Sequence, residues 1–170
     1  MTDPGSADPS VWAAFELVSV ESVPSVPPWL SARLLHPGVP REFADGQYQA
    51  LPQAARREVA GLTVVDFGVG GAGARFSVDI DTRAVVWQPT DLRPVVRRAN
   101  STIDQFSECI RVVTEVVVPP TDDFDIDDFE RVGDLLREAV ESIDDAPFAE
   151  DADGDGFWFS VYYDVGIGSY

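Results

Sequence analysis

Residues 62–110 read LTVVDFGVGGAGARFSVDIDTRAVVWQPTDLRPVVRRANSTIDQFSECI, and this stretch decides the fold because it carries two competing patterns. Its glycines at residues 68–73 form a G-x-G-x-x-G string, which in dinucleotide-binding proteins turns a strand into a helix whose N–H groups bind pyrophosphate. Here residues 75–80 alternate polar and apolar side chains, which is typical of a half-buried strand, and residues 84–87 form the next predicted strand. We therefore predict that the glycines form a hairpin loop after the strand at residues 62–67.

The second half of this stretch predicts a junction between the sheet and a helix. Residues 94–98 are expected to add an extended segment. Ser101 and Asp104 then form an S-x-x-D capping signature, in which the serine hydroxyl accepts an N–H of the first helical turn. The helix is expected to end near Val118, before two prolines. Its apolar positions recur at helical spacing: Ile103, Phe106, Ile110, Val113 and Val117.

Other helices are predicted on both sides of this stretch. Residues 28–35, PWLSARLL, favour a helix with proline in its first turn, and a Pro-Gly pair after them favours its end. A short helix is expected at residues 52–58. A longer helix is predicted at residues 127–142, where apolar residues recur at helical spacing and the aspartates at its start complement the helix dipole.

Length and composition favour one domain. With 170 residues and 45% hydrophobic content, we predict a single domain at residues 11–170 behind a disordered leader at residues 1–10. No apolar run approaches the roughly 18 residues needed to span a bilayer, and the N-terminus lacks a basic signal-peptide region. We therefore expect a cytoplasmic protein with no membrane partner. Cys109 is the single cysteine, so intrachain disulfides are excluded and a small core residue is predicted.

The choice of basic residues excludes several classes of enzyme. All 12 basic residues are arginine, so the chain offers no lysine for a P-loop, a Schiff base or a Ser-Lys pair. The one histidine, His36, is followed directly by Pro-Gly, which favours a loop position over a general base or a metal ligand. We predict that the protein is not an enzyme and binds no cofactor.

The net charge of −18 is concentrated near the C-terminus. Residues 121–156 hold 15 acidic residues and two arginines, a net charge of −13. This field repels phosphates, so direct binding of nucleic acid is not expected, whereas a basic protein partner would be attracted to it. For any single aspartate, plain solvation of an exposed helix or loop is the competing interpretation.

Residues 151–156, DADGDG, offer a candidate calcium loop. Carboxylates at alternate positions followed by glycine fit the start of such a loop, but its twelfth position is Tyr162 instead of a bidentate glutamate. An acidic linker is the interpretation we prefer. Residues 157–163, FWFSVYY, have strand propensity, and a partly exposed Trp158 or Tyr162 could anchor a partner. The weak candidate metal ligands are Asp151, Asp153 and Asp155.

Four segments, taken in order, resemble the SUKH superfamily (SMI1/KNR4-like), and within it the SUKH-4 type of immunity protein. They are LHPGVP at residues 35–40, the strand at residues 62–67 with its glycine loop, the strand pair at residues 75–87, and ANSTIDQF at residues 99–106, with a weaker match in the Phe-Trp pair at 157–158. The resemblance implies an α+β fold of one domain, with a central, mainly antiparallel or mixed sheet flanked by helices. It also implies a helix after Gly156, where the residues themselves favour a strand. The family's motifs are scaffold positions, so no partner-contacting residue is transferred.

The resemblance implies an immunity protein of a bacterial polymorphic toxin system, which binds and neutralises a cognate toxin. An acidic inhibitor can occupy the basic substrate-binding surface of a nuclease or another toxin that acts on nucleic acid. Two alternatives stay open: a calcium-binding acidic interaction protein that uses residues 151–156, and a nucleotide-binding enzyme that uses residues 68–73. The candidate partner-binding residues lie in DDFDIDD, residues 122–128: Asp122, Asp123, Asp125, Asp127 and Asp128.

Overall fold

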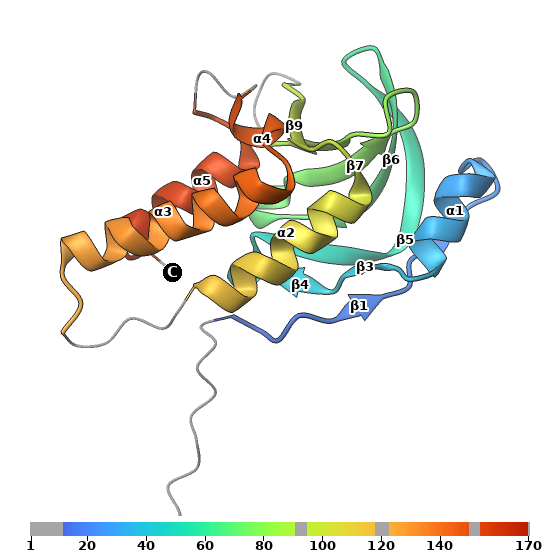
Figure 1. The fold of residues 1–170 in the computed structure, drawn as a ribbon. Helices are drawn as coiled ribbons and strands as arrows, with labels where there is room; N and C mark the ends of the chain where they lie inside the picture. Colours follow the sequence, from blue (N-terminus) through green and yellow to red (C-terminus); the bar gives the residue numbers. More distant parts are fainter. Residues whose placement is uncertain (1–11, 91–94, 118–122, 150–153, 170) are drawn as a thin grey trace, which may run out of the picture.

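The computed structural model describes residues 12–90, 95–117, 123–149 and 154–169, which form a mixed sheet flanked by helices (Figure 1). The protein therefore has the α+β fold that was expected. The predicted leader at residues 1–10 lies outside the described residues.

The main sheet contains seven strands within the described residues. Its hydrogen-bonded path runs β2-β5-β6-β7-β8-β9, with β4 paired to β5; neighbours on the path are antiparallel except β2, which is parallel to β5. A separate short pair joins β1 and β3. The strands are β1 (Leu17–Val18), β2 (Glu21–Ser22), β3 (Val39–Pro40), β4 (Glu42–Phe43), β5 (Tyr48–Val59), β6 (Leu62–Val69), β7 (Arg75–Asp79), β8 (Val85–Gln88) and β9 (Arg97–Asn100).

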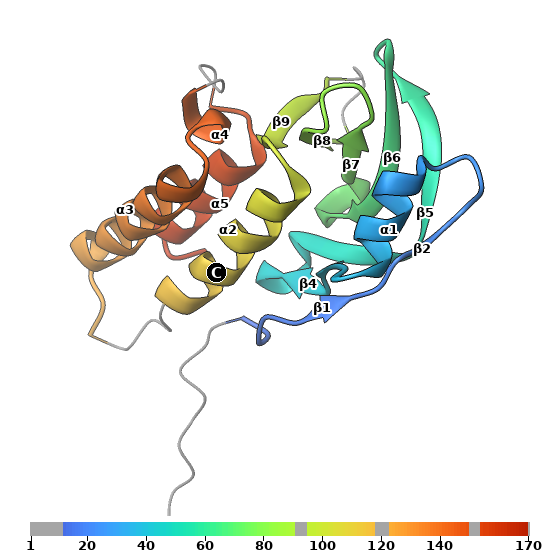
Figure 2. The same ribbon diagram turned by 45° about the vertical axis from the view of Figure 1, so that its right-hand side comes forward.

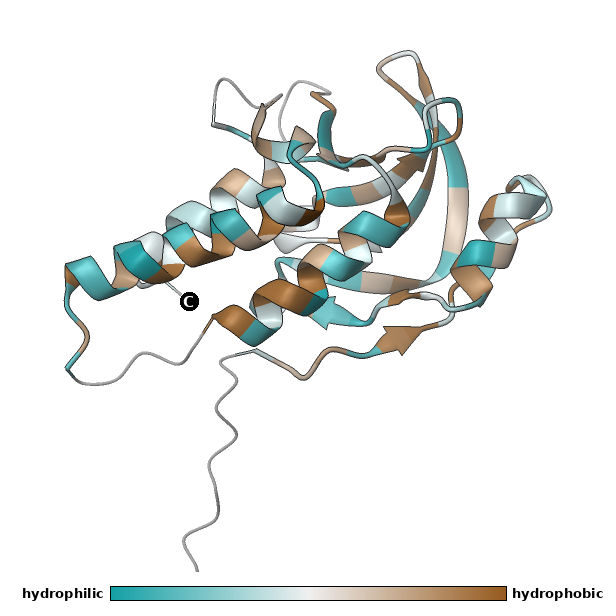
Figure 3. Ribbon diagram, in the orientation of Figure 1, coloured by the Kyte–Doolittle hydropathy of each residue, from teal (hydrophilic) through white to brown (hydrophobic). Residues whose placement is uncertain are grey.

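The helices cover the sheet because their apolar stripes need burial. α2 lies along the sheet, α3 and α5 lie side by side beyond it, and α1 lies near β2 and β5 (Figures 1 and 2). Hydrophilic residues recur along α3 between hydrophobic ones, as in an amphipathic helix (Figure 3). The helices are α1 (Pro28–Leu35), α2 (Ile103–Val116), α3 (Ile126–Ile143), α4 (Ala146–Ala149) and α5 (Phe157–Gly166).

Aromatic side chains form the centre of the core between the sheet and the helices. Phe76 of β7 packs its ring against Phe106 of α2, with centroids 5.6 Å apart, and against Phe157 of α5, with centroids 4.8 Å apart. Cys109 is fully buried in the same core, as predicted. Burial raises the pKa of its thiol to about 12, because the thiolate would be desolvated there.

The glycine string joins two strands, which confirms the predicted hairpin. Its loop contains a short 3₁₀ turn, Gly71–Gly73, and leads from β6 into β7. A Cβ added at Gly68 would lie 2.3 Å from Cε2 of Tyr48, and one added at Gly70 would lie 2.6 Å from the carbonyl oxygen of Gln47. These two glycines therefore allow close packing, and the chain that follows offers a strand instead of a helix N-terminus.

The helix expected at residues 52–58 is wrong, because these residues belong to β5. They pair with β6 through a hairpin whose two turn residues, Ala60 and Gly61, both have positive φ. Such a turn matches the twist of the two strands. Cross-strand pairing therefore outweighs the weak helical pattern of the segment.

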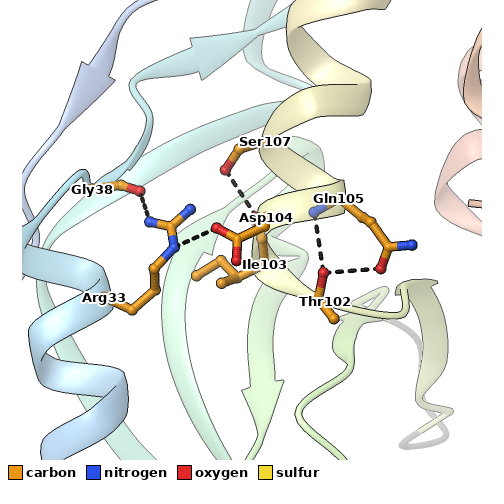
Figure 4. A network of polar contacts seen from close by, with 7 residues as sticks. All are labelled: Arg33, Gly38, Thr102, Ile103, Asp104, Gln105 and Ser107. Atoms are coloured by element: carbon orange, nitrogen blue, oxygen red, sulfur yellow. Dashed lines mark hydrogen bonds and ion pairs between the residues drawn. The ribbon is translucent and has the colours of Figure 1, made fainter. Parts of the chain in front are cut away.

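The cap of α2 is shifted by one residue from the prediction (Figure 4). Thr102 is the N-cap, and its hydroxyl oxygen accepts the backbone N–H of Gln105 at 3.2 Å. Asp104, in the first turn, accepts a hydrogen bond of 2.7 Å from Nε of Arg33, which also donates to the carbonyl oxygen of Gly38. These contacts tie the end of α1 to the start of α2.

Ser101 has a different partner, the buried carboxylate of Asp144 at the end of α3. The backbone N–H of Ser101 donates to Asp144 at 2.6 Å, its hydroxyl donates at 2.9 Å, and Nδ2 of Asn100 donates at 3.1 Å. Oδ1 of Asn100 accepts a bond of 2.9 Å from Nε1 of Trp158. One polar network therefore joins β9, the start of α2, the end of α3 and α5.

The aromatic segment after Gly156 is a helix, so its strand propensity gave the wrong prediction. Trp158 is 1% exposed and cannot be the exposed anchor that the sequence allowed. Its burial depends on helical spacing, which turns Phe157, Trp158, Val161 and Val165 inward together. No helix in the described parts of the chain is both long enough and apolar enough to cross a membrane.

Candidate partner-binding surface

The start of α3 divides the predicted binding acids into two groups. Asp125 is the N-cap and accepts the N–H of Asp128 at 3.1 Å, while Asp128 accepts the N–H of Asp125 at 3.4 Å. Asp128 also accepts a hydrogen bond of 2.7 Å from Arg131. These two aspartates therefore stabilise the helix end, which the dipole of α3 also favours.

Two of the other predicted acids of this segment are exposed and have no partner within the described chain. Asp123 and Asp127 are exposed and form no hydrogen bond or ion pair with another described side chain. Asp122 lies outside the described residues. Asp123 and Asp127 therefore remain candidate contacts with a partner, whereas Asp125 and Asp128 stabilise the start of α3.

Further acids of α3 extend this surface along the helix. Its two arginines are engaged by acids of the helix itself, Arg131 by Asp128 and Arg137 by Glu141, which raises the pKa of Arg137. The exposed acids without an ion pair among the described residues are Glu130, Asp134 and Glu138.

Exposed apolar side chains lie next to these acids. Ile126 of α3 is 58% exposed, Tyr163 of α5 is 57% exposed, and Ile167, just after α5, is 48% exposed. A hollow of about 170 Å³ lies between α3 and α5. It is lined by Glu130, Tyr162, Tyr163, Gly166 and Ile167. Apolar anchors surrounded by charged groups are typical of protein–protein interfaces.

The absence of a side chain at Gly133 lets α3 approach the backbone of α5 closely. A Cβ added at Gly133 of α3 would lie 3.3 Å from Cα of Gly166 in α5. Tyr163 and Ile167 were not predicted as surface residues, because residues 157–163 have strand propensity and a helix through Gly166 was not expected from them. The spacing of Phe157, Val161 and Val165, four residues apart, was the signal that could have identified an α-helix.

A larger hollow of about 530 Å³ lies on another side of α5. Asp164 lies in its wall, and Nε2 of Gln47 donates to Oδ2 of Asp164 at 3.2 Å. Burial raises the pKa of this carboxyl group. Asp45 and Trp12 line the same hollow, so acidic and apolar groups continue around the end of α5.

We call the surface of Asp123, Ile126, Asp127, Glu130, Asp134, Tyr163 and Ile167 the α3–α5 surface.

Only one of the three candidate calcium ligands, Asp155, lies within the described residues. Asp155 accepts a hydrogen bond of 2.8 Å from Nη2 of Arg97 of β9, while Asp151 and Asp153 lie outside the described residues. Tyr162, at the twelfth position, belongs to α5. Within the described ranges, no group of three or more His, Cys, Asp or Glu residues could hold a metal ion. His36 is exposed just after α1.

No protein-family model, curated protein or solved structure matches this chain. The resemblance to the SUKH superfamily therefore stays a prediction.

Proposed function

We propose that this protein is an immunity protein that binds a cognate bacterial toxin and neutralises it by covering a basic substrate-binding surface. The proposal rests on the segments that resemble SUKH-4 proteins. It is supported by two features of the fold: a sheet that leads into a capped helix at residues 99–106, and a helix after Gly156, which that resemblance implies.

The observation that carries the proposal is the α3–α5 surface. It combines exposed acids without ion pairs among the described residues with the exposed side chains of Ile126, Tyr163 and Ile167. The acids would attract a basic toxin and accelerate the encounter, and the apolar groups would hold it after water is expelled. A nuclease, or another toxin that acts on nucleic acid, has the required basic surface.

The same reasoning gives the protein a cytoplasmic role without catalysis. An inhibitor of this kind acts where the toxin meets its substrate, and it needs neither a cofactor nor direct contact with nucleic acid. The net charge of −18 opposes such contact.

The test is co-expression with the C-terminal toxin domain of a secreted protein encoded beside this chain. We expect the chain to restore growth of cells that express the toxin domain and to co-purify with it. A neighbouring toxin that kills equally well in the presence of the chain, or a neighbourhood without any toxin gene, contradicts the proposal.

A further inference from the structure

A polar hollow lies on the face of the sheet turned away from α2. Its volume is about 470 Å³, within the range of small-molecule sites. Phe67, Phe76 and Val85 point into the core, so the residues that alternate with them on β6, β7 and β8 point towards this other face. The lining of the hollow includes Arg57, Asp66, Gly73, Arg75, Gln88 and Thr90.

An ion pair between a buried carboxylate and a half-buried arginine lines this hollow. Asp66 of β6 is 4% exposed, and both of its carboxylate oxygens accept Nε–H of Arg57 from β5, at 2.8 and 2.9 Å. The hydroxyl of Ser77 on β7, itself 1% exposed, donates to Asp66, and Nη2 of Arg57 donates to Gln88 of β8 at 2.8 Å. Asp66 of β6 and Gln88 of β8 therefore orient the guanidinium group of Arg57, and Ser77 of β7 orients the carboxylate of Asp66.

Burying the carboxylate of Asp66 has a desolvation cost, and this cost is not needed merely to cover the sheet. A carboxylate withdrawn from water is destabilising unless hydrogen bonds and an opposite charge compensate for it, and apolar residues would cover a sheet without this cost. A fixed arginine, in contrast, is what recognition of a carboxylate or a phosphate requires, because the donors are already oriented.

The remaining groups of the hollow add donors and positive charge. Arg57 forms no bond through Nη1 within the described chain, and the exposed Arg75 forms no ion pair there. Two arginines and one carboxylate leave a local charge of +1 in a chain of net charge −18. Gly73 and Thr90 lie close together in the wall of the hollow, since a Cβ added at Gly73 would lie 3.4 Å from Oγ1 of Thr90.

We propose that this hollow binds a metabolite-sized ligand through an oxyanion group, a carboxylate or a phosphate, held by Arg57 and Arg75. The site is separate from the α3–α5 surface and independent of toxin binding. It also places Gly73, the last glycine of the G-x-G-x-x-G string, beside the ligand without the helix N-terminus that a dinucleotide-binding site uses.

The experiment is an NMR titration of the full chain with three probes: inorganic phosphate, adenosine monophosphate and citrate. We expect at least one probe to shift the signals of Arg57, Arg75, Gln88 and Thr90 in a saturable way below about 10 mM, which corresponds to modest affinity for a small ligand. Sodium chloride at equal ionic strength is the control for charge screening. Saturation by citrate alone assigns a carboxylate ligand, and saturation by the phosphates assigns a phosphate ligand.

Two matched variants distinguish binding in the hollow from a general effect of net charge. Arg75→Gln should weaken binding by about tenfold, because it removes a charged donor from the hollow but no ion pair among the described residues. Arg56→Gln makes the same change of charge one residue before Arg57, at an exposed position outside the hollow, and should leave affinity unchanged.

The proposal can be overturned without unfolding the protein. If no probe gives saturable shifts at these residues in the wild-type chain, the ion pair of Arg57 and Asp66 is structural only. Equal weakening by Arg75→Gln and Arg56→Gln would also overturn it, because binding would then follow net charge instead of the hollow.

Discussion

At the scale of single residues, the buried carboxylate of Asp144 depends on several hydrogen bonds from neighbouring elements. It is 5% exposed and accepts hydrogen bonds from Asn100, from two groups of Ser101 and from the N–H of Ala146. A buried carboxylate is tolerated when several donors surround it, and the donors in turn depend on it. The Asn-Ser pair in residues 99–106 therefore has a physical role as the anchor of three helices.

Asp144→Ala should lower the free energy of unfolding by about 3 kcal/mol, because several buried donors lose their acceptor at once. Urea unfolding followed by circular dichroism measures the change. The matched control is Asp145→Ala at the next, exposed position, which should change stability by less than about 0.5 kcal/mol. Similar effects of the two substitutions would show that the network contributes little.

Cys109 gives a prediction about pH. Its folded pKa of about 12 lies above the ordinary value of 9.0, mainly because of desolvation, so the unfolded chain releases the thiol proton first. The contribution of the thiol to stability is complete below pH 9.0 and is lost as the pH rises towards 12. Cys109→Ala should therefore have a shallower loss of stability in this range than the wild-type chain. Parallel curves from urea unfolding at a series of pH values would contradict the prediction.

At the scale of elements, two features of the α3–α5 pair position its exposed side chains. The capping box of Asp125 and Asp128 fixes the first turn of α3. The approach of Gly133 and Gly166 fixes the distance between α3 and α5 near their exposed apolar side chains. Both features are local, and each can be changed without altering the sheet.

Asp125→Ala should destabilise the protein by about 1 kcal/mol, since it removes the N-cap acceptor of α3. Asp127→Ala, two residues later, removes the same charge from an exposed position and should change stability by less than about 0.5 kcal/mol. Chemical denaturation of both variants gives the comparison. An equal loss in both would mean that charge near the helix dipole, and not the cap, is responsible.

Gly133→Val should destabilise the protein by about 2 kcal/mol, because its Cβ would lie 3.3 Å from Cα of Gly166 and the helices would have to separate. Gly166→Ala is the control, since no atom lies within 4 Å of a Cβ added there. Thermal unfolding compares the two variants. If Gly133→Val unfolds at the wild-type temperature, the helices are not in close contact at this point.

At the scale of the whole molecule, charge and apolar exposure should act on different steps of toxin binding. Long-range attraction by acids affects the association rate, while buried apolar anchors affect the dissociation rate. The chain concentrates its acids in residues 121–156, and the fold places Glu130 of α3 beside Tyr163 and Ile167. The two kinds of group can therefore be tested separately.

Reversing the charge of Asp123, Asp127 and Glu130 together should slow association with the toxin by about tenfold at low salt and reduce its salt dependence. The matched control reverses three exposed acids elsewhere in the fold: Glu21 of β2, Glu42 of β4 and Asp81 in the turn after β7. Tyr163→Ala should instead speed dissociation by about tenfold. Surface plasmon resonance with the purified toxin domain measures both rates. Equal effects of the two triple variants would place the interface elsewhere.

Local patterns in the sequence were sufficient to predict several helices and strands and to locate the concentration of negative charge. The strands on both sides of the glycine loop, the helix at residues 28–35 and the helix that was expected at residues 127–142 all follow from period and turn chemistry, which depend on neighbouring residues. The acids of residues 122–128 could be named from composition alone, but composition could not tell which of them cap α3 and which face solvent.

Features that depend on distant partners emerge from the tertiary fold and not from local sequence patterns. Residues 52–58 became a strand through pairing with β6, and the aromatic tail became a helix because α3, β9 and the core bury one side of it. The hollow at Arg57 takes its residues from several strands, and Asp144 meets Asn100 from 44 positions away. Local sequence sets the sign of each charge and the period of most elements. Burial and pairing act between segments far apart in the chain, and they decide the elements whose local pattern is weak or misleading.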